Sequence, residues 1–225
     1  MTRIPCPAVM PVDVDSWRTR LDLSTFVNAY YQYRDLQRFE HCREVLVVGP
    51  GQGLVPDVLR ARGYAVTTFD IDARFAPDHL GSVHDLSVFP DARFDAVIAS
   101  HVLEHLAVPF LDPALSEIAR VGRAALVYLP VAGRHVSLRV SPGFANIDVS
   151  LVCDLFNYFQ RPDGVTPSFM AAQHFWEVGR RGFSVASVRR RMATHFEIVD
   201  AYRNRDWLPS YNFVLRSSRS RDIAS

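Results

Sequence analysis

Three ionisable side chains near the middle of the chain could do chemistry in two different ways. The stretch "ASHVLEHLAVP" carries His101, Glu104 and His105 in the spacing H-x-x-E-H. In some zinc hydrolases this spacing lets two histidines bind the metal while the glutamate activates a water molecule. The same stretch also fits the turn after a buried strand, where it would line the mouth of a nucleotide-type pocket. The neighbouring residues decide between these two interpretations.

The zinc interpretation requires features that the neighbouring sequence does not favour. It needs a long helix that presents both histidines, and a third ligand well downstream. A strand-like run from Ala96 to Ala99 leads straight into the motif, Pro109 soon interrupts it, and Glu177 lies in an aromatic segment. We therefore expect no metal site, and we expect Glu104 and His105 to support a short helix by packing and hydrogen bonding.

A glycine-rich segment, Gly49-Pro50-Gly51-Gln52-Gly53, precedes this stretch and follows the apolar run "EVLVV". Its backbone could approach a ligand closely and point N–H groups at it. The spacing differs from the G-x-G-x-x-G of dinucleotide dehydrogenases. A phosphate-binding P-loop is excluded because all 25 basic residues of the chain are arginine. A tight strand-to-helix turn without a ligand is the alternative interpretation.

Acidic residues follow the glycine segment at the ends of predicted strands. Asp70 closes a strand, at the edge where a carboxylate can accept both hydroxyls of a ribose. Asp72 suits the cap of the next helix. Asp85 lies in a loop, where it could receive the amino group of an adenine while Leu86 covers the ring. Asp95 opens a strand and is expected to be structural.

The segments that carry these residues alternate between strand-like and helix-like patterns. Short apolar runs such as "EVLVV", "FDAVIAS" and "RAALVYLPV" are typical of strands buried on both faces. Helical spacing follows in "LVPDVLRARG", "PALSEIARVG" and "SVASVRRRM". The alternation predicts right-handed βαβ units, and therefore an α/β fold with a parallel sheet covered by helices on both faces.

The region from 132 to 184 interrupts the alternation and is rich in proline, glycine and aromatic residues. It is too long for an ordinary connection, so we expect a lid or a substrate-binding insertion. The domain organisation that follows has a helical cap over residues 1–40, a core over 41–131, this insertion over 132–184, a C-terminal helix and hairpin over 185–216, and a tail over 217–225.

The overall composition limits the class of protein. The 25 basic and 24 acidic residues nearly cancel, which argues against nucleic acid as a partner. Cys6, Cys42 and Cys153 are far apart and odd in number, so a disulfide framework is not expected. No run approaches 18 apolar residues, which argues against membrane insertion. We expect a cytoplasmic protein, and the exclusive use of arginine suggests a bacterial, GC-rich source.

Four motifs in one order, "VLVVGPGQG", "VTTFDID", "HDLSVFP" and "FDAVIASHVLEHL", resemble the consecutive motifs of class I S-adenosylmethionine-dependent methyltransferases of the type-11-like group. The resemblance covers roughly residues 43 to 130. It implies a Rossmann-like fold with a seven-stranded, mostly parallel sheet and an antiparallel last strand. It also implies S-adenosylmethionine as cofactor, with S-adenosylhomocysteine as product. The cofactor-binding residues that it implies are Gly49, Pro50, Gly51, Gly53, Asp70, Ile71, Asp85, Leu86, Ser100 and His101.

The sequence also offers an expected class of acceptor and candidate bases for the reaction. We expect a small-molecule or glycan-type acceptor chosen by the insertion, and His101, His135 and His174 are the candidate bases. The chain departs from the family at Val47, where an acidic residue usually helps to hold the cofactor's amino group. A methyltransferase-like binding or partner module without turnover is therefore the alternative function. The sequence leaves the methyl acceptor and the oligomeric state open, and a homodimer is compatible with it.

Overall fold

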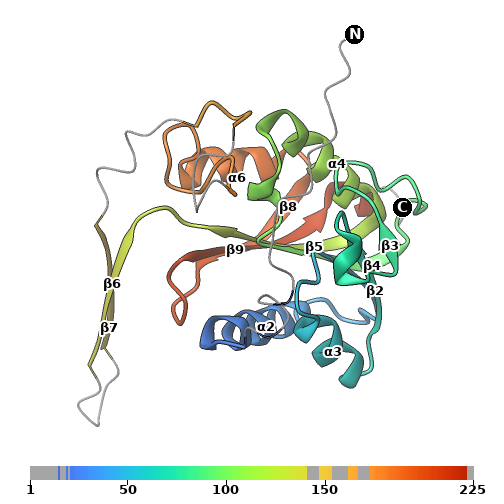
Figure 1. The fold of residues 1–225 in the computed structure, drawn as a ribbon, viewed down its shortest axis with the longest axis horizontal. Helices are drawn as coiled ribbons and strands as arrows, with labels where there is room; N and C mark the ends of the chain where they lie inside the picture. Colours follow the sequence, from blue (N-terminus) through green and yellow to red (C-terminus); the bar gives the residue numbers. More distant parts are fainter. Residues whose placement is uncertain are drawn as a thin grey trace.

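In the computed structural model, the described residues are 15, 19, 21–140, 147–153, 162–166 and 173–221, with side chains described except for 134–153, 220 and 221. Seven strands form one sheet in the order β3-β2-β1-β4-β5-β9-β8 (Figure 1). The strands of this sheet are β1 (Glu44–Val48), β2 (Ala65–Asp70), β3 (His79–Leu80), β4 (Phe94–Ser100), β5 (Gly122–Pro130), β8 (Phe196–Arg203) and β9 (Ser210–Ser217).

The pairing confirms the predicted fold class. β1 pairs in parallel with both β2 and β4, β2 pairs in parallel with β3, and β4 pairs in parallel with β5. β9 is antiparallel to both β5 and β8, and it is the last strand among the described residues. The carboxyl ends of β1, β2 and β4 therefore meet at one edge of the sheet. The glycine segment and His101 lie in the loops after β1 and β4, and Asp70 is the last residue of β2.

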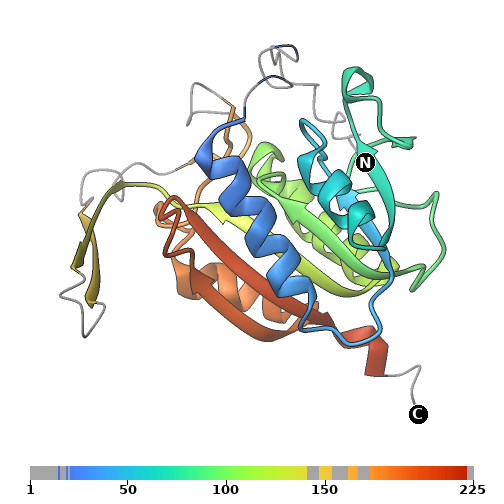
Figure 2. The same cartoon turned by 90° about the horizontal axis from the view of Figure 1, so that it is seen from below.

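Helices cover both faces of the sheet, as Figures 1 and 2 show. Helices α2 (Leu23–Leu36) and α3 (Leu54–Ala61) lie on one face, and α4 (Leu111–Val121) and α6 (Val185–Ala193) lie on the other. Each buried strand sends alternate side chains to the two faces. Thus Val45 and Val47 join the apolar cluster under α2 and α3, whereas Leu46 and Val48 join the cluster under α4 and α6. Burial on both faces explains the continuous apolar runs in the sequence.

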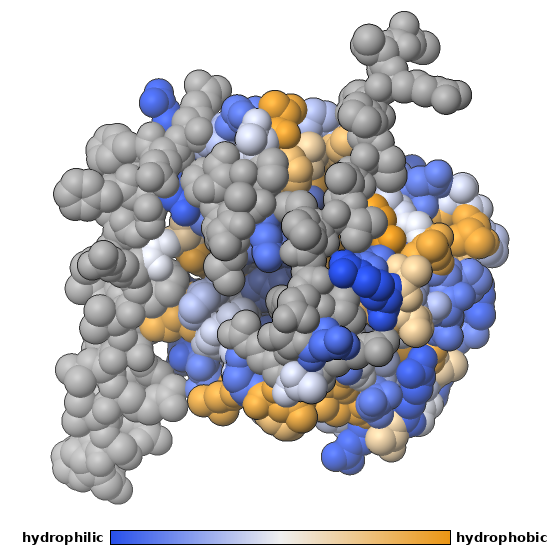
Figure 3. Space-filling model, viewed as in Figure 1, coloured by the Kyte–Doolittle hydropathy of each residue, from blue (hydrophilic) through white to orange (hydrophobic). Residues whose placement is uncertain are grey.

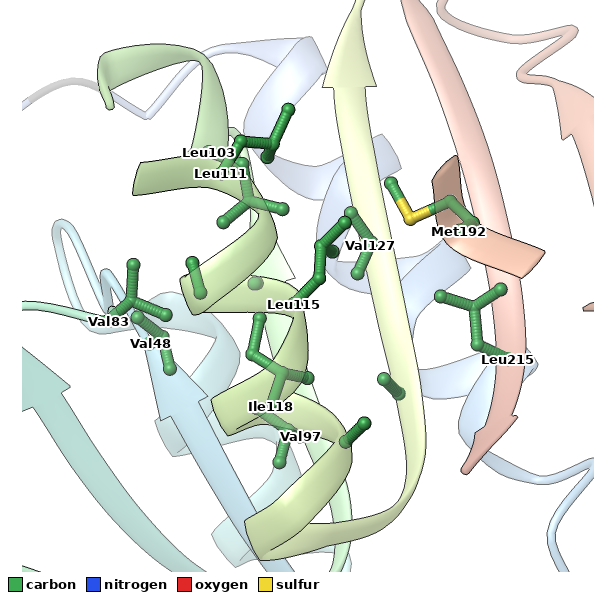
Figure 4. Close-up of a cluster of buried hydrophobic side chains, with 14 of the residues drawn as sticks. Val48, Val83, Val97, Leu103, Leu111, Leu115, Ile118, Val127, Met192 and Leu215 are labelled. Carbon is green, nitrogen blue, oxygen red and sulfur yellow. The ribbon is translucent and has the colours of Figure 1, made fainter. Parts of the chain in front are cut away.

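The larger cluster lies between α4 and the sheet (Figure 4). α4 buries Leu111, Leu115 and Ile118 along one face, at the i, i+4, i+7 spacing of an amphipathic helix. Gly122 ends the helix and begins β5, where a Cβ would lie 2.6 Å from the Val97 side chain. This cluster holds the β4 and β5 ends in fixed positions, and those ends support the loops described below.

Two features were not predicted. A two-residue strand, β3, adds an edge to the sheet, and the expected insertion contains an antiparallel hairpin of β6 (Arg134–Val140) and β7 (Ile147–Cys153). The hairpin projects away from the seven-stranded sheet (Figure 1). Cys42 is buried and free, while Cys6 and the Cys153 side chain lie outside the described part. Among the described residues, no helix is long and apolar enough to span a membrane.

Candidate functional site

The glycine segment forms the turn between β1 and α3. Gly49, Gly51 and Gly53 have φ angles of 67°, 54° and 87°, in the left-handed region that favours glycine. A Cβ on Gly49 would lie 2.5 Å from Cγ2 of Val102, so this position also lacks space for a side chain. Gly53 precedes the first residue of α3, where its conformation leads the chain into the helix. The turn therefore presents bare backbone at the carboxyl edge of the sheet.

A cavity of about 650 Å³ opens at this edge. Its walls come from the loops after β1, β2 and β4, from the start of α2, and from the segment 173–180 that lies far away in the sequence. On the face shown in Figure 3, hydrophobic and hydrophilic residues of the described part are intermixed. Among the predicted cofactor residues, the cavity is lined by Gly49, Pro50, Gly51, Asp70, Ile71, Ser100 and His101.

Asp70 is a half-buried carboxylate in the cavity wall. Burial raises its pKa, and the charge of Asp72 acts in the same direction, while the backbone N–H of Asp72 donates to Oδ1 at 2.8 Å. Asp72 itself accepts from the N–H of Arg74 at 3.0 Å and caps the following 3-10 turn, as predicted. Backbone N–H groups thus orient the Asp70 carboxylate, and Asp70 borders the cavity at the end of β2.

Asp85 and Leu86, which the sequence places at the adenine, do not belong to the lining of this cavity. Asp85 is exposed and accepts from the N–H of Ser87, and it borders a separate, shallower pocket. Leu86 is fully buried in the core, and its N–H donates to Glu117. The part of this loop that lines the cavity comes earlier, at Gly81, Ser82 and Val83. A local motif cannot show which residues of a loop turn inward, so the sequence alone could not single out Gly81, Ser82 and Val83.

His101 lies directly after β4 with φ 55°, an uncommon conformation for a residue with a side chain. Its N–H donates to the carbonyl oxygen of Tyr128 at 2.9 Å, which ties the turn to β5. The ring packs against Trp207 with a centroid separation of 5.0 Å. Nε2 lies 3.4 Å from Oγ of Ser210, and Nδ1 lies 3.5 Å from Oε1 of Glu104. The ring is thus held between two polar groups while it borders the cavity.

Glu104 is fully buried, and both of its carboxylate oxygens lack a hydrogen-bond partner among the described residues. Burial opposes its ionisation, but the proximity of His101 and the charges of the surrounding histidines hold its pKa below the ordinary value. Burial lowers the pKa of the neighbouring His105. Both residues lie in the short 3-10 helix Leu103–His105, as expected, and both also border the cavity.

The segment 173–180 brings His174 to the same wall. The N–H of Phe175 donates to the carbonyl of Glu104 at 2.9 Å, and Nε1 of Trp176 donates to the carbonyl of Leu103 at 3.1 Å. Trp176 is fully buried and stacks on Phe183. These bonds fix the segment on the loop after β4. One possible ligand atom from each of Glu104, His105 and His174 lies within 4.8 Å of the other two.

The three candidate bases have different positions. His101 and His174 share the cavity wall, whereas the side chain of His135, on β6, lies outside the described part. His174 is buried, and its Nδ1 lies 3.0 Å from Oε1 of Glu177. Of the arginines near the insertion, Arg180 is also buried and pairs with Glu177 at 2.8 Å. In the sequence, "QHFWE" carries His174 and Glu177 three residues apart, and this spacing was the pattern that could have indicated the pair.

A polar helix face was missed from the sequence. α2 contributes Thr25, Asn28 and Gln32 to the cavity wall, at the spacing of one helical face. Oδ1 of Asn28 is buried and has no hydrogen-bond partner in the described part of the chain. Val47 lines the same cavity from β1 and is 2% exposed. The tyrosines of α2 do not line the cavity; Tyr31 is buried and donates to Asp206.

Comparisons with known proteins agree with this architecture. Residues 46–125 match a family model described as "Methyltransferase domain". The PH0226 protein from Pyrococcus horikoshii OT3 superposes with a TM-score of 0.57 at 14% identity, over 90% of this chain and 96% of that chain. A SAM dependent methyltransferase from Archaeoglobus fulgidus gives 0.56 at 13%, over 91% and 98%. A glycopeptide N-methyltransferase complexed with S-adenosyl-L-homocysteine gives 0.53 at 11%, over 94% and 100%. No curated protein matches the sequence.

Proposed function

We infer that this chain, a class I S-adenosylmethionine-dependent methyltransferase by its domain family and fold, transfers a methyl group to a small organic acceptor. The observation that carries this proposal is the cavity at the carboxyl edge of the sheet, where the glycine turn, Asp70 and His101 meet. In α/β sheets, ligands bind in the crevice outside the carboxyl ends of the strands. Each of the three features occupies such an end.

The residues present fit the cofactor. Gly49 and Gly51 line the cavity without side chains, so the bare backbone there suits close contact with a ligand. The half-buried carboxylate of Asp70 suits the two hydroxyls of a ribose. The loop of Gly81, Ser82 and Val83 takes the place that the sequence assigned to Asp85, and we propose that it borders the adenine.

The polar face of α2 helps to decide between an active methyltransferase and the alternative function, a binding module without turnover. Val47 offers no charge to the cofactor's amino group, and this observation favours the alternative. However, Asn28 has a buried amide oxygen without a partner in the described residues, and it lines the same cavity. An amide oxygen can accept a hydrogen bond from an ammonium group. We propose that Asn28 takes over the role of the acidic residue that this chain lacks.

When bound, S-adenosylmethionine supplies a methyl group on a positively charged sulfur, and the bonding pair stays on sulfur as the acceptor's lone pair forms the new bond. The chain's own residues then have two tasks, which are to align the acceptor and to exclude water. A hydroxyl or ammonium acceptor must also lose a proton. His101 lines the cavity between Glu104 and Ser210, and we propose that it receives this proton.

Calorimetric titration with S-adenosylhomocysteine tests the proposal. Asp70→Asn should weaken binding by roughly 10- to 100-fold, because a hydrogen bond to a charged group contributes about 1.5–3 kcal/mol. Asp85→Asn is the matched control and should leave the affinity unchanged, since Asp85 is exposed outside the cavity. Failure of the unmodified chain to bind would refute the methyltransferase proposal. Equal losses in both variants would contradict the placement of the ribose.

A further inference from the structure

The most unusual group in the cavity wall is the buried carboxylate of Glu104. A charged carboxylate with neither oxygen hydrogen-bonded is costly in a protein interior unless a positive charge compensates it. The nearby His101 lies at 3.5 Å, but its geometry provides no hydrogen bond. Because Glu104 borders the cavity and its carboxylate lies close to His105 and His174, a bound cation would satisfy it.

The hydrogen bonds of the two histidines leave the same nitrogen free in each ring. Nδ1 of His105 lies 2.9 Å from the carbonyl oxygen of Gln173, which can only accept, so Nδ1 carries the proton. Nδ1 of His174 lies 3.0 Å from the Glu177 carboxylate. Among the described residues, no hydrogen bond engages Nε2 of either ring. Each Nε2 therefore has a lone pair available for a ligand.

This arrangement is the one that supports metal-binding histidines. Such a histidine usually donates its other N–H to a carboxylate or a backbone carbonyl, which fixes the tautomer and the ring orientation. His105 has a backbone carbonyl as this partner, and His174 has the carboxylate of Glu177. Glu177 is itself held by Arg180, whose Nε and Nη2 donate to Oε2 at 3.0 and 2.8 Å. Each histidine thus has, within the protein, the hydrogen-bond partner that orients a metal-binding imidazole.

We propose that Glu104, His105 and His174 bind one divalent transition-metal ion, and that Zn²⁺ is the ion that this ligand set favours. Two imidazoles and one carboxylate are a known ligand set for zinc sites that keep a fourth position open. One possible ligand atom of each residue lies within 4.8 Å of the other two, and a tetrahedral zinc ion needs its ligands roughly 3.4 Å apart. Binding of the ion would therefore require side-chain rotations that bring the three groups closer together.

The metal site also indicates a class of acceptor for the proposed reaction. This inference about the acceptor rests on the proposed function. All three ligands line the cavity, so a fourth ligand of the ion would come from the space in which the acceptor would bind. A cation there lowers the pKa of a coordinated hydroxyl, which favours an acceptor with an oxygen nucleophile. His101, beside Glu104, would lie within reach of the proton that leaves.

Zinc binding to the full chain, freed of metal and of any affinity tag, tests the site. Calorimetry against a competing chelator should show one Zn²⁺ per chain. Glu104→Gln keeps the shape of the side chain, and His174→Ala removes a ligand. Each should weaken binding by about 100-fold or more, since loss of a supporting residue alone costs about 10- to 100-fold. His195→Gln alters a half-buried histidine away from the cavity and should leave the affinity unchanged.

A second measurement does not depend on the folding of any variant. Co²⁺ added to the unmodified chain should give the intense visible absorption of a four-coordinate site. Absence of that spectrum, absence of one-to-one zinc binding, or equal affinity in a folded Glu104→Gln variant would each overturn the site. S-adenosylhomocysteine is titrated in parallel. If the chain binds zinc but not S-adenosylhomocysteine, the metal site stands and the proposed function fails. If it binds S-adenosylhomocysteine but not zinc, the proposed function stands and the metal site fails.

Discussion

At the scale of single residues, the cavity depends on backbone conformations that most side chains avoid. His101 is held in the left-handed region, which costs a residue with a side chain of the order of 1–3 kcal/mol. Its bond to Tyr128 and its packing on Trp207 maintain it there. Gly49 lies opposite, against Val102, which follows His101 in the chain. The turns after β1 and β4 therefore constrain each other.

Gly49→Ala should be more destabilising than Gly51→Ala. Both positions have positive φ, which costs an alanine about 1–2 kcal/mol. Only at Gly49 does the new methyl group also meet Cγ2 of Val102, at 2.5 Å, whereas a Cβ on Gly51 meets nothing within 4 Å. We expect losses in the free energy of unfolding of about 2–4 kcal/mol at Gly49 and about 1 kcal/mol at Gly51, measured by urea denaturation.

The contact with Val102 can be isolated by a double-mutant cycle. If overlap with the valine causes the excess loss, Val102→Ala in the Gly49→Ala background should restore about 1 kcal/mol relative to the sum of the single changes. Additive effects would instead show that the backbone conformation alone accounts for the cost.

At the scale of elements, polar side chains tie neighbouring strands together at the edge opposite the cavity. Asp95, at the start of β4, accepts from the backbone N–H groups of Arg43 and Glu44 at 2.9 and 3.0 Å, just where β1 begins. This confirms the structural role predicted for Asp95. Burial by itself raises the pKa of Asp95, but these two N–H groups and the nearby Arg123 hold it below the ordinary value.

The lowered pKa predicts how stability depends on pH. A carboxyl group whose pKa is lower in the folded state stabilises the protein above its unfolded pKa, near 4, and this contribution is lost as the pH falls through the folded pKa. Asp95→Asn should therefore reduce the free energy of unfolding at pH 7 by about 1 kcal/mol, because the carboxylate is partly exposed. The difference between variant and parent should shrink toward pH 3.

Glu40→Gln serves as the control for this prediction, since Glu40 is exposed in the connection between α2 and β1. It should change the free energy of unfolding little at either pH. A gap between Asp95→Asn and the parent that stays constant from pH 7 to pH 3 would show that charge on Asp95 does not carry the interaction.

At the scale of the whole molecule, the seven-stranded sheet and its helices form a body to which the hairpin is attached. In the described part of the chain, β6 pairs with β7 alone, and the hairpin extends away from the sheet (Figure 1). The segment 173–180, in contrast, is anchored on the loop after β4. The expected insertion thus consists of a part that completes the cavity wall and a part that projects from it.

Replacing residues 134–153 by a short glycine-serine linker should preserve the folded core. β6 and β7 do not belong to the seven-stranded sheet, and residues 130–133, which line the cavity just before β6, are kept. We expect the free energy of unfolding to change by less than about 1 kcal/mol. S-adenosylhomocysteine affinity, measured by calorimetry, should stay within about threefold of the parent. A large loss of either quantity would show that the hairpin packs on the body in solution.

The sequence determined the parts of this protein that depend on local pattern. Three patterns follow from backbone geometry over a few residues: the apolar runs of strands buried on both faces, the helical spacing, and the glycines at a strand end. The α/β fold and the positions of the glycine turn and Asp70 could therefore be predicted. Which residues of the loop after β3 turn inward could not be predicted: Ser82 lines the cavity, whereas Asp85 borders a separate pocket.

Only the tertiary structure decided what the H-x-x-E-H letters mean. Glu104 and His105 are separated from His174 by about seventy residues, and hydrogen bonds from the segment 173–176 to the loop after β4 bring them together. Long-range pairing of this kind depends on how a whole insertion docks on the core. Only in the folded chain is the Glu104 carboxylate also buried without a hydrogen-bond partner among the described residues, because packing of the surrounding residues excludes water from the carboxylate.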